Sequence, residues 1–191
     1  MKNSFSETTN ASIGFNVYHN LIDDWTYWNP DRNYRVENLL QVLSQGFELT
    51  TSVKYLKDRI IAGFSSIYAF TDASQQNSYN AYSGDIIGKQ LIYVPVHSVS
   101  LNTYIGKGDW IFNFQGLYNS ERFVTFDHSG SPFPPYFLLN TSISGKIKLG
   151  KVQSNIVFQF NNLTNTVYPN VKKNAMPGRS FQVGLVLNLF N

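Results

Sequence analysis

The sequence predicts an all-β protein, an antiparallel meander of about eight long strands. These strands form part of a transmembrane β-barrel, or an open curved sheet if the chain is alone. Three observations predict this fold: apolar residues recur at every second position, connections alternate between long and short, and polarity comes mostly from uncharged residues. An alternation with a period of two is typical of strands with one apolar and one polar face.

The alternation is clearest in the final strand, where Phe181, Val183 and Leu185 alternate with Gln182 and Gly184. Similar patterns mark seven other segments. The predicted strands are residues 12–21, about 39–55, 59–70, 96–105, 110–118, 136–149, 151–160 and 181–189. Several reach ten residues or more, which is enough to cross a bilayer when tilted.

The connections between these strands alternate in length along the whole chain. Long connections lie near residues 22–38, 71–95, 119–135 and 161–179, and short ones near 56–58, 106–109 and 150–151. All long connections therefore fall at one end of the sheet and all short ones at the other. Outer-membrane barrels have this asymmetry, with short periplasmic turns and longer extracellular loops.

The composition distinguishes a membrane-spanning β-sheet from a soluble one. Charged residues are 14% of the chain, against roughly 25% in an average soluble domain, while aromatic residues are 16%. Mean hydropathy is only −0.21, because asparagine, serine, glutamine and threonine supply the polarity. Soluble β-proteins normally use charge on exposed faces and edges. This composition therefore favours a lipid-facing side and a side that faces an aqueous lumen.

Composition also excludes several classes of function. The net charge of +3 is too small and too scattered to indicate nucleic-acid binding. The absence of cysteine excludes a disulfide framework and thiol chemistry. No run of 18 apolar residues predicts a transmembrane helix. Residues 1–14 lack the apolar core and the cleavage site of a signal peptide.

Two other folds fit the same alternation. A complete small barrel of eight strands requires residues 12–21 to pair with residues 181–189. A soluble β-sandwich requires a second sheet against the apolar face, and its aromatic loops would bind carbohydrate. Pairing between the first and last strands, or two sheets around a dry core, would distinguish these folds from an open wall.

Four segments carry a resemblance to a known family. They are GFNVYHNLIDDW at 14–25, NLLQVLSQGFEL at 38–49, LIYVPVHSVSL at 91–101, and the Asn-Leu…Tyr…Pro-Gly-Arg-aromatic ending at 161–191. In this order and spacing, residues 10–191 resemble the C-terminal barrel region of TonB-dependent outer-membrane receptors, the siderophore and cobalamin transporter family.

The resemblance implies a 22-stranded barrel with a plug domain in its lumen, and active uptake of an iron-siderophore, cobalamin or glycan. An inner-membrane complex supplies energy through a motif on the plug. The plug, that motif and most of the strands are not found in this sequence. We therefore expect residues 1–191 to be one segment of a receptor in the cell outer membrane, in contact with lipid, that does not transport alone.

No residue pattern predicts catalysis, cofactor binding or a metal site. His19, His97 and His128 lack ligand spacing, and no pattern places a catalytic nucleophile or a second carboxylate with Asp23–Asp24 or Asp127–His128. We therefore expect the protein not to be an enzyme and to need no cofactor.

Aromatic residues of the long connections are the candidates for ligand binding. Trp25, Trp28, Tyr79 and Tyr82 fit either an aromatic girdle at the membrane interface or a stacking surface for an extracellular ligand. Glu48 and Lys54 fall on the polar parity and are expected to face the lumen. Residues 177–179, Pro-Gly-Arg, lack the glycine spacing of a phosphate loop and predict a turn into the last strand.

Overall fold

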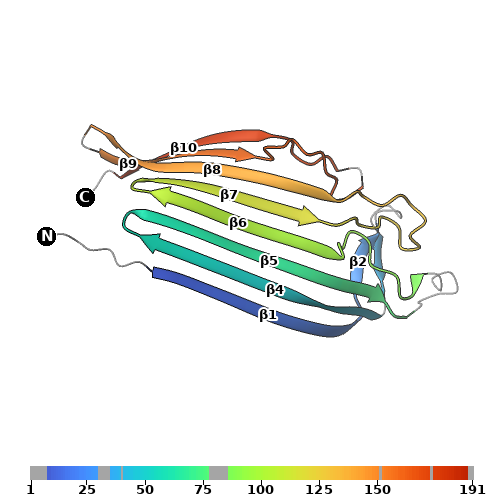
Figure 1. Ribbon diagram of the computed structural model, residues 1–191. Coiled ribbons are helices and arrows are strands. Elements are labelled where there is room, and N and C mark those ends of the chain that lie inside the picture. Colours follow the sequence, from blue (N-terminus) through green and yellow to red (C-terminus); the bar gives the residue numbers. More distant parts are fainter. Residues whose placement is uncertain are drawn as a thin grey trace.

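A computed structural model describes residues 8–29, 35–39, 41–77, 86–150, 152–172 and 174–188. Its main feature is an eight-stranded antiparallel sheet with the order β1-β4-β5-β6-β7-β8-β9-β10 (Figure 1). The strands of this sheet are β1 (Thr8–Asp23), β4 (Gln41–Lys57), β5 (Ile60–Gln75), β6 (His97–Lys107), β7 (Trp110–Asn119), β8 (Tyr136–Leu149), β9 (Val152–Asn161) and β10 (Ser180–Asn188). A separate hairpin joins β2 (Thr26–Asn29) to β3 (Arg35–Asn38).

The sheet is open, which confirms the predicted fold class. Within the described residues, β1 pairs only with β4 and β10 pairs only with β9. The prediction of a closed eight-stranded barrel is therefore wrong for this structure. The β-sandwich is also wrong, because the other sheet of the described residues is the two-stranded β2–β3 hairpin. Within the described part of the chain, no helix is both long enough and apolar enough to cross a membrane.

All eight predicted strands are present, and the long and short connections lie at opposite ends of the sheet (Figure 1). The short turns contain Asp58, Gly108 and Gly150, each with a positive φ, as tight hairpin turns require. Three details differ from the sequence-based expectation. β1 runs from Thr8 to Asp23, beyond the expected residues 12–21. β5 continues to Gln75, where it pairs with Val42, and the first long connection contains the β2–β3 hairpin. Strands of four residues are too short for a periodic pattern to reveal.

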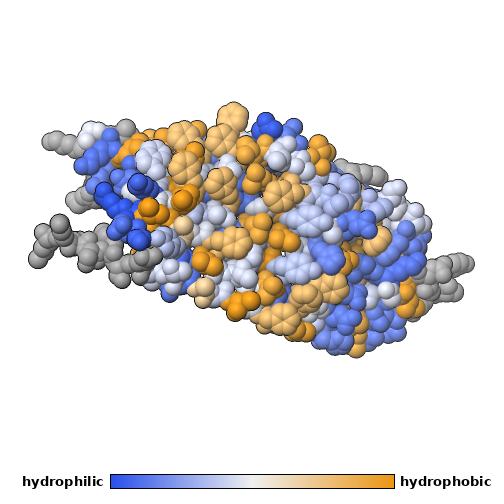
Figure 2. Space-filling view, viewed as in Figure 1, coloured by the Kyte–Doolittle hydropathy of each residue, from blue (hydrophilic) through white to orange (hydrophobic). Residues whose placement is uncertain are grey.

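One face of the sheet is apolar and exposed. The register aligns Phe15, Leu49, Tyr68, Val99, Tyr118 and Phe137 in one row across six strands. Exposure reaches 67% at Phe15 and 77% at Phe181. Figure 2 shows apolar side chains gathered over the middle of the strands, with hydrophilic residues at both ends. We call this surface the apolar face.

Glycines in the strands make room for aromatic rings on both faces. A Cβ atom added to Gly63 would overlap the ring of Tyr104, its partner on β6. Gly145 is covered in the same way by Trp110 on β7. Placing an aromatic ring over a strand glycine restores apolar packing at a position without a side chain of its own.

The packed core lies at the long-loop end. The buried residues there are Leu39, Val42, Ala73 and Leu91, with Tyr27, Val94 and Phe126 packed against them. They come from the first three long connections and the adjoining strand ends. The loops are therefore a packed layer in their own right, while the middle of the sheet leaves its apolar side chains exposed.

Candidate functional site

The second face of the sheet, which we call the polar wall, is lined mostly by uncharged polar residues. One register row consists of Ser12, Ser52, Ser65, Asn102, Gln115 and Asn140. The Ser12 and Ser52 hydroxyl oxygens are 2.8 Å apart and share a hydrogen bond. Glu48 and Lys54 lie on this same face, as the sequence predicted, because they alternate with Leu49 and Val53 of the apolar face.

The polar wall has hollows whose lining includes several polar side chains. One, of about 300 Å³, is bordered by Asn102, Gln115 and Asn140, and another of about 140 Å³ by Asn113 and Gln159 among others. The side-chain oxygen of Asn102 is buried and accepts no hydrogen bond from the described residues. Buried polar atoms are nearly always satisfied by protein or water. This face is therefore suited to contact water or a polar partner.

At the long-loop end, Arg122 joins two connections. Its side chain is only 3% exposed, and its Nη2 donates to the Pro169 carbonyl at 2.7 Å. Its Nη1 donates to the Asn170 Oδ1 at 3.2 Å, and the guanidinium lies 4.8 Å from the Tyr136 ring centroid. Burial lowers the pKa of Arg122 from its ordinary value, but an arginine stays protonated in proteins. A buried cation thus joins the β7–β8 connection to the β9–β10 connection.

A second set of contacts joins the β5–β6 and β7–β8 connections. The rings of Phe123 and His128 stack with centroids 3.5 Å apart. The His128 Nε2 donates to the Gln90 carbonyl at 2.8 Å, and the Tyr93 amide donates to the Phe123 carbonyl at 2.9 Å. Three long connections therefore form one packed layer, which sequence reasoning did not find because its contacts cross long sequence separations.

Carboxylates at the long-loop end accept hydrogen bonds from neighbouring residues. Two hydrogen bonds from Ser129, from its amide and then its hydroxyl, lower the pKa of Asp127 to about 2, with Thr125 contributing further. The neighbouring His128 instead bonds Gln90, so the two side chains have separate partners. Asp23 accepts from Gln41 at 2.9 Å and Asp24 from Asn38 at 3.1 Å. The Asp23–Gln41 bond joins the paired ends of β1 and β4, and the other contacts fix loop geometry.

The three histidines do not converge. His19 and His97 lie on the apolar face with β4 and β5 between their strands, whereas His128 lies in the β7–β8 connection. His97 accepts or donates a hydrogen bond with the Tyr68 hydroxyl at 2.9 Å. Within the described ranges, no group of three histidine, cysteine, aspartate or glutamate residues could hold a metal ion.

The structure describes two of the four aromatic residues that the sequence suggested as ligand-binding candidates. Trp28 lies on β2 and is 68% exposed, while Trp25 is exposed just before that strand. Tyr27 instead packs against Phe126, with ring centroids 4.9 Å apart. Tyr79 and Tyr82 lie outside the described residues. Trp25 and Trp28 thus lie exposed at the long-loop end of the sheet.

Residues 177–179 lead directly into β10, as the sequence predicted. The Arg179 amide donates to the Asn165 Oδ1 at 3.0 Å, and the buried Asn162 donates to the Pro177 carbonyl at 3.4 Å. Hydrogen bonds from asparagine side chains therefore hold this turn, and β10 begins at Ser180.

Long antiparallel strands, an exposed apolar face, a polar face with few charges and long loops at one end define a segment of an outer-membrane β-barrel wall. The family model described as TonB dependent receptor-like, beta-barrel, matches residues 3–165. The chain belongs to the TonB-dependent receptor family, whose barrels are outer-membrane proteins. The resemblance in the sequence is thereby confirmed.

Solved structures show the same fold. The unliganded ferric citrate transporter FecA matches with a TM-score of 0.67 at 17% identity, over 94% of this chain and 29% of its own. BauA, the ferric preacinetobactin receptor from Acinetobacter baumannii, matches with a TM-score of 0.53 at 12% identity, over 92% of this chain and 34% of its own. The chain thus spans about a third of the length of these receptors. No curated protein matches it significantly.

Proposed function

We propose that this chain forms part of the barrel wall of an outer-membrane receptor that takes up a bulky nutrient such as an iron-siderophore, cobalamin or a glycan. One observation carries the proposal, the exposed apolar face. Its side chains need a lipid environment, because apolar surface of this extent in water favours association. The family and the two iron-complex neighbours, FecA and BauA, support the substrate class.

The proposed receptor needs more than this chain. The strands β1 and β10 each have an unpaired edge within the described residues, and unpaired edges inside a bilayer leave backbone groups without hydrogen bonds. We therefore infer that further strands close the wall and that a plug domain occupies the side of the polar wall. The energy-coupling inner-membrane complex would act through that plug. The chain alone is not expected to transport.

Membrane association and closure can be tested together. The 191-residue chain is expected to float with lipid vesicles in a density gradient and to show β-sheet circular dichroism. Because it contains no cysteine, introduced pairs report strand neighbours directly. Val157→Cys with Gly184→Cys, which are directly opposed on β9 and β10, should form a disulfide. Gly14→Cys on β1, combined in turn with Gln182→Cys, Gly184→Cys or Val186→Cys on β10, should not do so within one chain.

A monomeric chain that stays in buffer and ignores the vesicles would contradict the proposal. An efficient disulfide between β1 and β10 would instead support a closed small barrel.

Extracellular ligand contact is proposed for Trp25 and Trp28, because both are exposed at the long-loop end. Their fluorescence should change on addition of a nutrient that the receptor recognises. The probes are ferric citrate, ferric preacinetobactin, cyanocobalamin and a maltodextrin, each added to the vesicle-bound chain. Trp28→Phe should abolish most of the change if Trp28 stacks on the ligand, whereas Trp110→Phe on the apolar face should preserve it. An unchanged response in Trp28→Phe would assign this residue to the membrane interface.

A further inference from the structure

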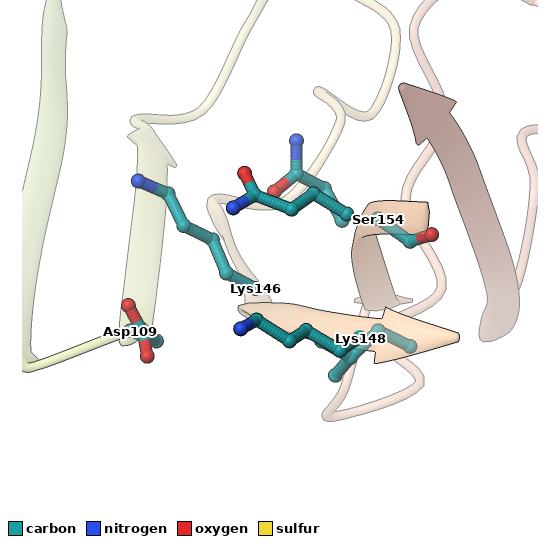
Figure 3. Close-up of a pocket in the computed structure, with 7 residues that line it drawn as sticks. Asp109, Lys146, Lys148 and Ser154 are labelled. Carbon is teal, nitrogen blue, oxygen red and sulfur yellow. The ribbon is translucent and has the colours of Figure 1, made fainter. Parts of the chain in front are cut away.

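A cavity of about 530 Å³ lies at the short-turn end of the sheet, between β8 and β9. Its lining residues are Asp109, Lys146, Ile147, Lys148, Gln153, Ser154 and Asn155. We call it the lysine cavity. In Figure 3 the side chains of Lys146 and Lys148 extend toward the side of the cavity where Asp109 lies, whereas the Ser154 side chain points the other way.

The register places the lysines on the polar wall. Lys146 is opposite Asn155 and Lys148 is opposite Gln153, and both lysines share the parity of Asn140 and Ser142 on β8. The intervening Ile147 belongs to the parity of the apolar face and is opposite Ser154. The two ammonium groups therefore project toward the barrel interior.

The part of β8 that lines the lysine cavity is positively charged, whereas the polar parity of the rest of β8 is not. Toward the loops, the polar parity of β8 carries Asn140, Ser142 and Ser144, which are uncharged. The cavity holds two ammonium groups against one carboxylate, that of Asp109, whose backbone carbonyl accepts from the Lys146 amide at 3.1 Å. Carboxamides at Gln153 and Asn155 add further donors. Two cations flanked by amide donors form an arrangement that recognises carboxylates.

We propose that the lysine cavity binds an acidic, extended segment of polypeptide on the barrel interior, with carboxylates at alternate residues. Lys146 and Lys148 are two residues apart on one strand, so their Cα atoms are separated by about 6.6 Å. Alternate residues of an extended peptide have the same spacing, so two carboxylates can meet two ammonium groups. The proposal rests on the proposed function, in which a plug domain occupies this side of the wall.

A phospholipid is a less suitable occupant. Lipid headgroups would meet the apolar-face parity, which at this end of the sheet carries Lys57 and Lys107. The lysines of the cavity have the opposite parity. The cavity is also larger than a single free carboxylate requires, which favours a peptide over a small acid.

The test uses the 191-residue chain in a non-ionic detergent and a fluorescent blocked pentapeptide, Gly-Glu-Ser-Glu-Gly. Anisotropy should show binding that weakens with salt, as contacts between exposed charges do. The double variant Lys146→Gln/Lys148→Gln should weaken binding at least about tenfold, because it removes both charge-assisted contacts. Lys54→Gln is the matched control, since Lys54 is a polar-wall lysine outside the cavity, and it should leave binding unchanged. Asp109→Asn removes a repulsive carboxylate and should tighten binding.

Four outcomes would overturn the proposal. They are no binding to a chain that retains its β-sheet circular dichroism, equal weakening by Lys54→Gln, equal competition by free glutamate, and a lysine-dependent preference for anionic phosphatidylglycerol vesicles over the peptide. If the chain floats with vesicles but ignores the peptide, only this inference fails. If it does not float, the proposed membrane function fails whether or not the peptide binds.

Discussion

The two faces of β7 differ in polarity, so that adjacent residues of this strand alternate between apolar and polar side chains. Phe112 and Phe114 lie on the apolar face, whereas Asn113 and Gln115 lie on the polar wall. In a soluble sandwich the apolar side would pack against a second sheet. Here Phe114 is 45% exposed, and the buried hydrophobic residues of the described chain gather at the long-loop end. The comparison teaches that this sheet is suited to two different environments, lipid on one side and a polar interior on the other.

The largest expected effect comes from placing a charge on each face of the same strand. Phe114→Lys should destabilise the vesicle-bound sheet by about 2–4 kcal/mol, because a lysine near the bilayer centre loses its hydration. Gln115→Lys should cost far less, because its side chain projects toward the polar interior. Urea titration followed by the fluorescence of Trp110, on the same strand, measures both variants. Equal losses would mean that the two faces meet the same environment.

The difference between the two faces could be predicted from the sequence. The contacts that pack the long connections together could not. Alternation with a period of two depends only on neighbours along the chain, so it revealed eight strands and their two faces. The contact from Arg122 to Pro169 spans 47 residues and follows no periodic pattern. Lys146 and Lys148 were visible on the polar parity, but Asp109 joins them from a different turn. Whether the first and last strands pair to close a barrel could not be predicted either, because pairing between distant strands depends on register and not on local pattern.

A substitution at Arg122 tests whether the packed long connections are stabilised independently of the sheet and its two faces. Arg122→Gln removes donors to the Pro169 carbonyl and Asn170, which should lower the local opening free energy of residues 162–172 by about 1.5–3 kcal/mol. Hydrogen exchange and limited proteolysis of that connection measure the change. Lys89→Gln is the control, because its exposed contact with the Asp127 carbonyl should contribute within about 0.5 kcal/mol. Accelerated exchange throughout β7 and β8 would show that the loop layer and the sheet open together.

A glycine on the polar wall tests how tightly that face is packed. Gly63→Ala places a methyl group where the Tyr104 ring lies, so the ring must move, at a cost of about 1–2 kcal/mol. Gly14→Ala is the control on the same face, because its added methyl group would lie 3.9 Å from the Thr50 Cβ. Adding Tyr104→Ala to Gly63→Ala should remove the clash, and a double-mutant cycle by urea titration measures the coupling. Zero coupling would mean that Tyr104 does not occupy the space above Gly63.

The smallest expected effect concerns Asp127, whose charge should influence its own loop and neither face. Its pKa is lowered from 3.8 to about 2, so the ionised carboxylate is the form that the folded loop stabilises. That contribution is complete above pH 3.8 and is lost as the pH falls through about 2. Ser129→Ala removes the hydroxyl donor but keeps the amide donor, so the pKa should rise part of the way toward 3.8. Carbon-13 NMR titration of the labelled carboxyl in detergent measures this shift. An unchanged pKa of Asp127 in Ser129→Ala would assign its lowering to the backbone amide and Thr125. Chemical shifts of β7 residues that change at the same pH midpoint would show that the loop charge affects the sheet.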